Sequence, residues 1–141
     1  MRKYFFILVS LLILSSCEKE TILTTAKIPT EITNYTNTHF PDYPIIQVKK
    51  EVDGSKLTYE VKLTGAYELE FNRKKEVVEI EGVMALPNSV IPFKLLQYVN
   101  SNYPDNFITE WDLEKRKQEI TLDNDLQLEF DLDGNFIRID D

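Results

Sequence analysis

Hydrophobic and polar residues alternate in short blocks over most of the chain after residue 44. In residues 57–63, leucine, tyrosine and valine occupy every second position, with threonine, glutamate and lysine between them. Residues 66–72 and 126–131 alternate in the same way, and both contain Leu-Glu-Phe. A period of two places alternate side chains on opposite faces of a strand, one buried and one in water. The pattern therefore indicates antiparallel strands with one wet face.

Turn residues separate these blocks and set the bounds of the predicted strands. Asp53-Gly54, Thr64-Gly65 and Asp133-Gly134 are typical of hairpin turns. The predicted strands span residues 45–51, 57–63, 66–72, 76–81, 107–114, 117–122, 126–131 and 135–140.

Two segments before these strands predict helices. Each begins at an Ile-Pro pair, with Pro29 or Pro92 in the first turn, and ends before Pro41 or Pro104. Apolar residues recur on one face of both segments. At an offset of 63 residues, Tyr35 matches Tyr98, and the strands that follow match at an offset of 59. The order of helix and four strands thus occurs twice.

We interpret residues 28–82 and 83–141 as two tandem copies of one unit. One copy of about 50 residues buries too little surface to be stable alone. We therefore expect an α+β fold with one continuous sheet of about eight strands and both helices on its apolar face. Phe71 and Phe130 should be buried on that face, with Glu70 and Glu129 exposed on the other.

The first residues predict the location of the protein. Residues 4–14 are almost entirely apolar and follow Arg2 and Lys3, which fits a signal peptide in residues 1–16. The run is shorter than the about 20 residues of a membrane-spanning helix. Leu14-Ser15-Ser16-Cys17 resembles the lipobox of bacterial lipoproteins, which implies cleavage before Cys17 and lipid attachment to its thiol. The alternative is a general secretory signal with a chance cysteine.

Cys17 is the only cysteine, so no second thiol exists for it to pair with. We predict that residues 17–27 are a lipidated N-terminus and a tether. The residue after Cys17 is not Asp, so the simplest inner-membrane retention signal is absent. We expect an anchor in the outer membrane, on its periplasmic or cell-surface side, with no other contact to the membrane.

Composition excludes several classes of function. The chain has 16 Lys and Arg against 24 Asp and Glu, and cleavage before Cys17 changes the net charge from −8 to −10. Such an acidic chain has no electrostatic footprint for nucleic acid. One histidine and one cysteine leave no histidine-based metal cluster, catalytic triad or disulfide framework. We expect no enzyme activity, catalytic residue, metal or cofactor.

Individual polar residues have ordinary structural interpretations beside functional ones. His39 fits a helix end better than a catalytic base, because its counterpart is Asn102. Residues 131–135 resemble the start of a calcium loop, but the surrounding alternation favours a hairpin turn. Trp111 is expected in the core rather than as a stacking platform. The basic cluster at residues 73–75 is interpreted as solubilising.

The repeated pattern of Ile-Pro, Tyr and Phe/Tyr-Pro, followed by four amphipathic strands with Leu-Glu-Phe, resembles the PepSY-like lipoprotein domain. This family is also described as beta-lactamase-inhibitor-like. The resemblance covers about residues 28–140. It implies tandem units in a continuous concave sheet and an extracytoplasmic location. It implies binding or inhibition only by analogy, because a fold does not determine a function.

We expect a lipid-anchored module that binds a protein or peptide on the polar concave sheet face, and that is an inhibitor of an envelope or secreted protein if the analogy holds. Two alternatives stay open: a structural or chaperone-like envelope lipoprotein, and a hydrolase that cleaves glycans with paired carboxylates. The candidate binding residues are Glu68, Glu70, Gln127, Glu129 and Arg138.

Overall fold

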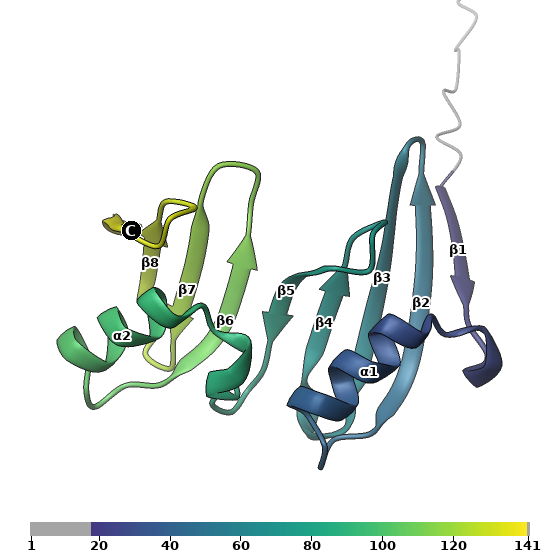
Figure 1. The fold of residues 1–141 in the computed structure, drawn as a ribbon, viewed down its shortest axis with the longest axis horizontal. Coiled ribbons are helices and arrows are strands. Elements are labelled where there is room, and N and C mark those ends of the chain that lie inside the picture. Colours follow the sequence, from purple (N-terminus) through teal and green to yellow (C-terminus); the bar gives the residue numbers. More distant parts are fainter. Residues whose placement is uncertain (1–17, 141) are drawn as a thin grey trace, which may run out of the picture.

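The computed structural model describes residues 18–140. The predicted signal peptide and Cys17 lie outside the described residues. The described chain forms one nine-stranded antiparallel sheet in which the strands lie side by side in chain order. Two α-helices lie on the same face of this sheet (Figure 1). The α+β class and the single antiparallel sheet are confirmed, whereas the sheet has nine strands rather than eight.

The helices and strands follow the predicted order. The helices are α1 (Thr30–His39) and α2 (Phe93–Asn102). The strands are β1 (Glu18–Ile22), β2 (Ile45–Asp53), β3 (Lys56–Leu63), β4 (Glu68–Phe71), β5 (Val77–Glu81), β6 (Ile108–Leu113), β7 (Gln118–Leu122), β8 (Gln127–Phe130) and β9 (Phe136–Asp140). Short 3-10 turns, η1 (Thr25–Lys27), η2 (Thr64–Ala66) and η3 (Asn88–Val90), connect them.

The additional strand corrects the expectation of a tether. Strand β1 pairs with β2 from Glu18 opposite Asp53 to Ile22 opposite Lys49. All five of its side chains are exposed. Backbone hydrogen bonds to β2 therefore hold this segment at the edge of the sheet, although none of its side chains is buried. A strand with no buried side chain shows no alternation of hydrophobic and polar residues, so the sequence pattern missed it.

Both helices use the same devices at their ends. Pro29 and Pro92 directly precede the first helical residues, where a missing amide donor costs nothing. The backbone N–H groups of Phe40 and Tyr103 close the final turns by donating to carbonyl oxygens four residues earlier. No helix within residues 18–140 combines the length and the apolar composition needed to cross a membrane.

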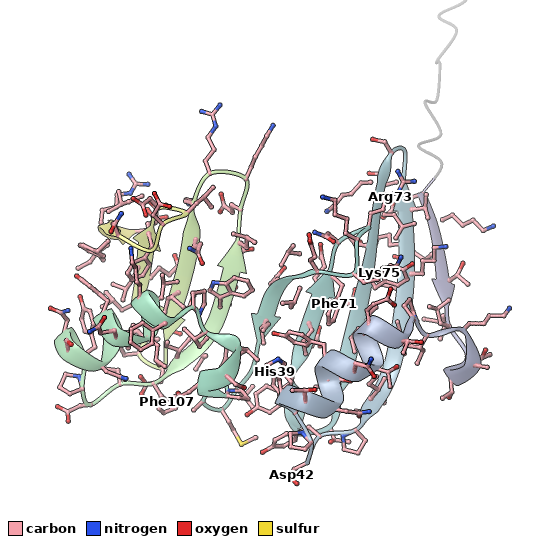
Figure 2. The ribbon with its side chains drawn as sticks, viewed as in Figure 1. His39, Asp42, Phe71, Arg73, Lys75 and Phe107 are labelled. Carbon is pink, nitrogen blue, oxygen red and sulfur yellow. The ribbon has the colours of Figure 1, made fainter. Side chains whose placement is uncertain are left out.

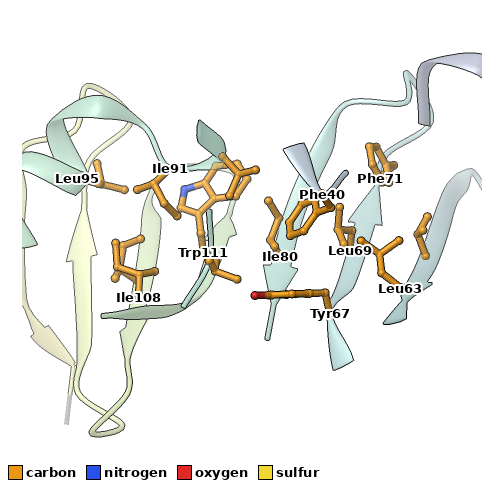
Figure 3. Packing of buried hydrophobic residues seen from close by; sticks show 14 of the residues in the cluster. Phe40, Leu63, Tyr67, Leu69, Phe71, Ile80, Ile91, Leu95, Ile108 and Trp111 are labelled. Atoms are coloured by element: carbon orange, nitrogen blue, oxygen red, sulfur yellow. The ribbon is translucent and has the colours of Figure 1, made fainter. Parts of the chain in front are cut away.

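One apolar row crosses the sheet beneath the helices. Its members pair in register from strand to strand: Val48, Val61, Leu69, Ile80, Trp111, Ile120, Leu128 and Ile139. All but Ile139 are buried. Ile80 on β5 faces Trp111 on β6, so this row continues between the first four-stranded segment after α1 and the second after α2 (Figure 3). The two halves therefore share one core.

Equivalent aromatic residues attach each helix to the sheet. Phe71 and Phe130 are fully buried, as predicted. The ring of Tyr35 meets Phe71 edge-on at 5.5 Å, and the ring of Tyr98 meets Phe130 edge-on at 5.3 Å. Aromatic pairs favour this edge-to-face geometry. The same contact thus occurs at the same place in both halves.

Candidate functional site

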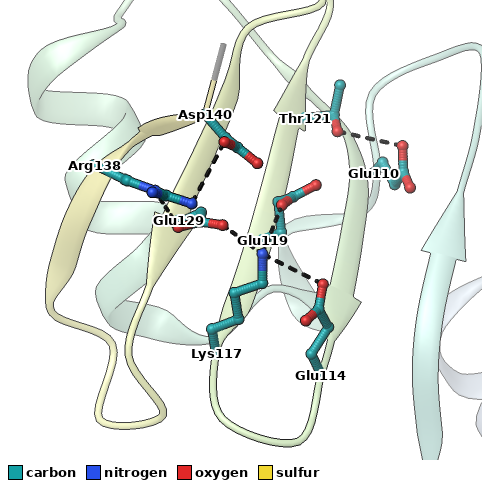
Figure 4. Close-up of polar contacts among 8 residues, drawn as sticks. All are labelled: Glu110, Glu114, Lys117, Glu119, Thr121, Glu129, Arg138 and Asp140. Atoms are coloured by element: carbon teal, nitrogen blue, oxygen red, sulfur yellow. Dashed lines mark hydrogen bonds and ion pairs between the residues drawn. The ribbon is translucent and has the colours of Figure 1, made fainter.

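Charged and polar side chains cover the sheet face opposite the helices in two rows that run across the strands, and Figure 4 shows the part of these rows on β6, β7, β8 and β9. The first row consists of Lys49, Glu60, Glu70, Glu79, Asp112, Glu119, Glu129 and Arg138. The second row consists of Gln47, Lys62, Glu68, Glu81, Glu110, Thr121, Gln127 and Asp140. The first row has a cation at each end, Lys49 and Arg138, the second row has one cation, Lys62, near one end, and both rows have carboxylates in the middle.

Four carboxylates on β5 and β6 lie opposite one another at the middle of these rows. Glu79 faces Asp112, and Glu81 faces Glu110. We call these four residues the acidic centre. Within residues 18–140, no lysine, arginine or histidine nitrogen lies within 4.0 Å of their carboxylate oxygens. Like charges directly opposite each other destabilise a sheet. The acidic centre is therefore electrostatically unfavourable in the isolated protein.

The pKa values of this cluster reflect the same conflict. Burial, reinforced by the negative charges of Asp112 and Glu70, raises the pKa of Glu79 from 4.5 to about 6. Burial also raises the pKa values of Glu110 and Asp112, although the Thr121 hydroxyl donates a hydrogen bond to Glu110 that opposes the shift. With a pKa of about 6, Glu79 is still mainly ionised at neutral pH. A cation placed beside them would relieve the repulsion.

A shallow hollow adjoins the acidic centre on strands β3, β4 and β5. Its volume is about 160 Å³. The lining residues are Glu60, Glu68, Leu69, Glu70, Glu79 and Glu81. Sites for drug-sized ligands occupy about 300–1,000 Å³. The hollow therefore suits the end of one cationic side chain better than a whole small molecule.

Glu129 differs from the other carboxylates of the first row, and its expected exposure is wrong. Its exposed fraction is 4%. The Lys117 ammonium donates to one of its oxygens, and Arg138 Nε donates to the other at 2.6 Å (Figure 4). The hydrogen bonds from Arg138 and Lys117 lower the pKa of Glu129. Lys117 and Arg138 already pair with its charge. This is unfavourable for the predicted role of Glu129 as a residue that binds a partner.

The structure does not bring the five predicted binding residues into one site. Glu68 and Glu70 on β4 border the acidic centre; Glu70 is half-buried rather than exposed. Gln127, Glu129 and Arg138 lie on β8 and β9, with β5, β6 and β7 between the two groups. The positions of all five residues on the polar face agree with the predicted alternation, but the residues do not form the single site that was predicted.

Sequence reasoning left Glu110 and Asp112 out of the candidate site. They alternate with Trp111, which is the signal that places them on the polar face. Their proximity to Glu79 and Glu81 depends on the register between β5 and β6. The connection between these strands spans residues 82–107 and includes α2. Turn chemistry cannot fix a register over such a connection.

Three residues with functional alternatives have structural roles. His39 ends α1, and its Nδ1 lies 2.9 Å from the Ser89 hydroxyl oxygen (Figure 2). Trp111 is buried, and its Nε1 donates to Gln118 Oε1 at 3.2 Å. Asp131 accepts a hydrogen bond from the Asn135 backbone N–H at 2.8 Å within the β8–β9 turn. The helix-end, core and turn interpretations are confirmed.

Comparison with known protein families adds the identity of the chain. Residues 1–17 match a prokaryotic membrane lipoprotein lipid attachment site. Residues 15–58 and 57–138 match the family described as "Putative beta-lactamase-inhibitor-like, PepSY-like". The chain belongs to this PepSY-like family. The attachment site and the family together agree with the predicted lipoprotein and the predicted resemblance.

Solved structures similar to this PepSY-like chain come from Bacteroides. A "putative calcium-regulated periplasmic protein" of Bacteroides thetaiotaomicron has a TM-score of 0.81 and 29% identity, over 86% of this chain and 97% of that chain. A "putative periplasmic protein" of Bacteroides vulgatus has a TM-score of 0.80 and 30% identity, over 86% of this chain and 97% of that chain.

A third similar structure, a "putative periplasmic protein of unknown function" of Bacteroides vulgatus, has a TM-score of 0.81 and 28% identity, over 87% of this chain and 100% of that chain. A comparison with curated proteins gave no match. The lipid attachment site and the periplasmic relatives support an extracytoplasmic, membrane-anchored protein. Neither the family description nor these three names refers to an enzymatic activity.

Proposed function

We propose that this PepSY-like lipoprotein is a non-enzymatic binding module of the cell envelope, anchored in the outer membrane, whose acidic sheet face binds a basic segment of another protein. The acidic centre is the observation on which this proposal depends. Its four carboxylates face one another without a cationic partner in residues 18–140. Charges that destabilise the free protein are typical of surfaces used for binding.

The shape of the face favours an extended partner with lysine or arginine side chains. The hollow beside the acidic centre has room for one ammonium or guanidinium group, and five glutamates surround it. An arginine could bond two carboxylate oxygens at once. The other carboxylates of both rows already have a lysine or arginine partner, so the unpaired negative charge is concentrated at the acidic centre. Electrostatic complementarity of this kind increases association rates and specificity.

An inhibitor role is one form of this function. A module that covers a basic loop of an envelope or secreted enzyme would block that loop without any catalytic group. The family description, which refers to a beta-lactamase inhibitor, supports this form by analogy. A structural or chaperone-like role would use the same face with several partners.

Calcium binding on the same face is a second candidate. One similar structure is named a "putative calcium-regulated periplasmic protein". Calcium takes six to eight oxygen ligands at about 2.3–2.6 Å. In residues 18–140, two groups of three carboxylates place oxygens within 4.8 Å of one another: Glu18, Glu20 and Glu51, and Glu119, Glu129 and Asp140. The acidic centre is not one of them, so calcium there would require its side chains to move.

Isothermal titration of the mature protein with a lysine-rich peptide tests the first candidate. The face variant replaces Glu79, Glu81 and Glu110 with Gln and Asp112 with Asn. The control variant changes net charge equally at exposed positions away from the acidic centre: Glu31→Gln, Asp42→Asn, Asp105→Asn and Asp133→Asn. We expect the wild type and the control variant to bind the peptide several-fold more tightly than the face variant.

Equal binding by the face and control variants would overturn the proposed site, because net charge alone would then explain the affinity. A parallel titration with calcium distinguishes the second candidate. The calcium titration uses variants of the two carboxylate groups, Glu20→Gln with Glu51→Gln, and Glu119→Gln with Asp140→Asn. If the wild type binds calcium and one of these variants loses calcium, while the face variant still binds the lysine-rich peptide as the wild type does, the face is a cation site rather than a protein site. Crosslinking of the wild-type and face-variant proteins in intact cells would then identify the natural partner.

A further inference from the structure

The start of β1 lies at one particular end of the sheet. Glu18 is opposite Asp53, so the start of β1 is beside the β2–β3 turn. Because neighbouring strands are antiparallel, the β4–β5, β6–β7 and β8–β9 turns lie at the same end (Figure 1). We call this end of the sheet the anchor end.

Basic residues gather in three of the anchor-end turns. These residues are Lys56, Arg73, Lys74, Lys75, Lys115, Arg116 and Lys117. They are half of the 14 lysines and arginines that follow Cys17, although the mature chain has a net charge of −10. Figure 2 shows Arg73 and Lys75 at this end, and Asp42 at the other.

Most of these cations have no anionic partner within the described chain. No carboxylate oxygen in residues 18–140 lies within 4.0 Å of the side-chain nitrogens of residues 73–75, Lys115 or Arg116. Lys75 is half-buried and the others are exposed. Lys117, by contrast, pairs with Glu129. Five positive charges are therefore available to a ligand at this end.

The opposite end of the sheet has the opposite charge. Its connections include residues 40–44, 64–67, 103–107 and 123–126. These four segments contain four aspartates, and no lysine or arginine. The anchor end also contains six carboxylates: Glu18, Asp53, Glu76, Glu114, Asp131 and Asp133. Seven cations against six anions give this end a net charge of +1, against −4 for the four opposite segments. The positive charge of the anchor end is concentrated in the β4–β5 and β6–β7 turns, which we call the basic turns.

The lipid anchor lies at the same end of the sheet as the basic turns, beside the acidic residues Glu18 and Asp53. Cys17 is bonded to Glu18, so their Cα atoms are about 3.8 Å apart. The lipid attachment site ends at Cys17. The β6–β7 turn lies five strand spacings from β1, or about 24 Å at about 4.8 Å per spacing. Charges in salt are screened within about 8 Å. This turn can therefore interact with the membrane only when the whole anchor end faces the headgroups.

We propose that the anchor end is a docking surface for anionic phospholipid headgroups. The acyl chains fix the β1 edge of the sheet, and the turns around residues 74 and 116 fix the rest through ion pairs with lipid phosphates. Clusters of lysine and arginine beside a membrane anchor bind anionic lipids in this way. The strands then stand upright on the membrane, and the acidic face points sideways.

Fluorescence quenching in vesicles tests this orientation with the mature lipidated protein. Acylation occupies Cys17, so a single new cysteine can be labelled. Leu132→Cys places a fluorophore on the exposed β8–β9 turn at the anchor end, and Asn124→Cys places one at the opposite end. The vesicles contain a headgroup nitroxide in phosphatidylcholine, with or without phosphatidylglycerol. With phosphatidylglycerol, we expect several-fold stronger quenching at position 132 than at position 124.

Two variants separate docking from anchoring. The reversal variant, Arg73→Glu, Lys74→Glu, Lys115→Glu and Arg116→Glu, should lose the difference between the two positions. The control variant, Arg73→Lys, Lys74→Arg, Lys115→Arg and Arg116→Lys, preserves charge and should retain it. Circular dichroism shows whether both are folded, and glutamine at the four positions replaces the reversal variant if it is not.

Two results would overturn docking on anionic headgroups. In the first, quenching at position 132 is equal in vesicles with and without phosphatidylglycerol. In the second, the folded reversal or glutamine variant keeps the wild-type difference. Either result would mean that the acyl anchor alone determines the orientation. These experiments do not involve the acidic face, so they are independent of the test of the binding module.

Discussion

Glu79 combines a raised pKa with a like-charged neighbour directly opposite on β6. Between its ordinary pKa of 4.5 and its folded-state pKa of about 6, the folded protein binds more protons than the unfolded chain. The free energy of unfolding therefore falls as the pH rises through this interval, and the loss is complete above it. The sign is opposite to that of a carboxylate in an ion pair.

Glu79→Gln should therefore stabilise the protein at neutral pH. It removes repulsion from Asp112 and the partial burial of a charge, which we expect to add about 1 kcal/mol to the free energy of unfolding at pH 7.5. The gain should disappear at pH 4.5, where Glu79 is protonated in the wild type. Urea denaturation at both pH values measures it. A destabilised Glu79→Gln protein at pH 7.5 would show that the carboxylate has a favourable partner.

Glu129 has the opposite dependence, because ion pairs lower its pKa. Its contribution to stability is present above the ordinary value of 4.5 and is lost as the pH falls through its folded-state pKa. Glu129→Ala removes the acceptor shared by Lys117 and Arg138. We expect the Glu129→Ala protein to unfold at a lower urea concentration than the wild type at pH 7, and the difference between the two midpoints to be smaller at low pH.

Glu70→Ala is the matched control for Glu129→Ala, because both residues belong to Leu-Glu-Phe segments. Glu70 has only a 3.9 Å contact with Lys56, so its removal should change stability by no more than about 0.5 kcal/mol. Equal effects of the two substitutions would show that the buried environment of Glu129 has no energetic consequence.

At the level of elements, period-two alternation predicted the strands whose one face is buried. Tyr59, Val61 and Leu63 on β3 are all buried, as the pattern required. The alternation could not predict β1, because its side chains are exposed and only its backbone pairs. Nor could it predict that Glu129 is buried among cations, because Lys117 reaches it from the β6–β7 turn and Arg138 from β9. Local patterns report burial by the core and not burial by polar neighbours.

Phe71→Ala and Phe130→Ala should each destabilise the protein by about 3–5 kcal/mol, because each leaves a cavity in a fully packed core. Small domains have about 5–15 kcal/mol of stability in total. Since Ile80 and Trp111 join both halves in one core, either substitution should shift a single melting transition. Calorimetry measures both the shift and the number of transitions.

Two transitions, each sensitive to only one of these substitutions, would contradict the shared core. The protein would then consist of two independently folding halves that meet at β5 and β6. In that case the acidic centre would lie between two domains rather than on one sheet face.

At the level of the whole molecule, membrane attachment through a lipid was predictable because the lipobox is a short linear sequence pattern. Cys17→Ser should abolish the incorporation of radiolabelled palmitate and leave a precursor or a soluble form. Membrane fractionation of cells that express each protein provides the second measurement. Palmitate incorporation into the Cys17→Ser protein would show that lipid is attached elsewhere.

The candidate site was only partly predictable from the chain. Alternation placed Glu68 and Glu70 on the polar face, and the family resemblance placed that face on one continuous sheet. The juxtaposition of β5 with β6 brings Glu110 and Asp112 opposite Glu81 and Glu79, and the connection between these two strands includes the whole of α2. A site assembled by long-range register requires coordinates, whereas its individual residues do not.

The absence of a flexible linker between Cys17 and β1 limits where the acidic face can search for a partner. With the anchor end docked as proposed, the acidic face stays within about one strand length of the lipid surface and diffuses in two dimensions with its anchor. A partner in the same membrane then meets it at a high effective concentration, so even a weak intrinsic affinity gives substantial occupancy. A partner held higher above the surface than the sheet extends cannot meet it at all. Affinities measured with soluble fragments will therefore underestimate binding to membrane-bound partners.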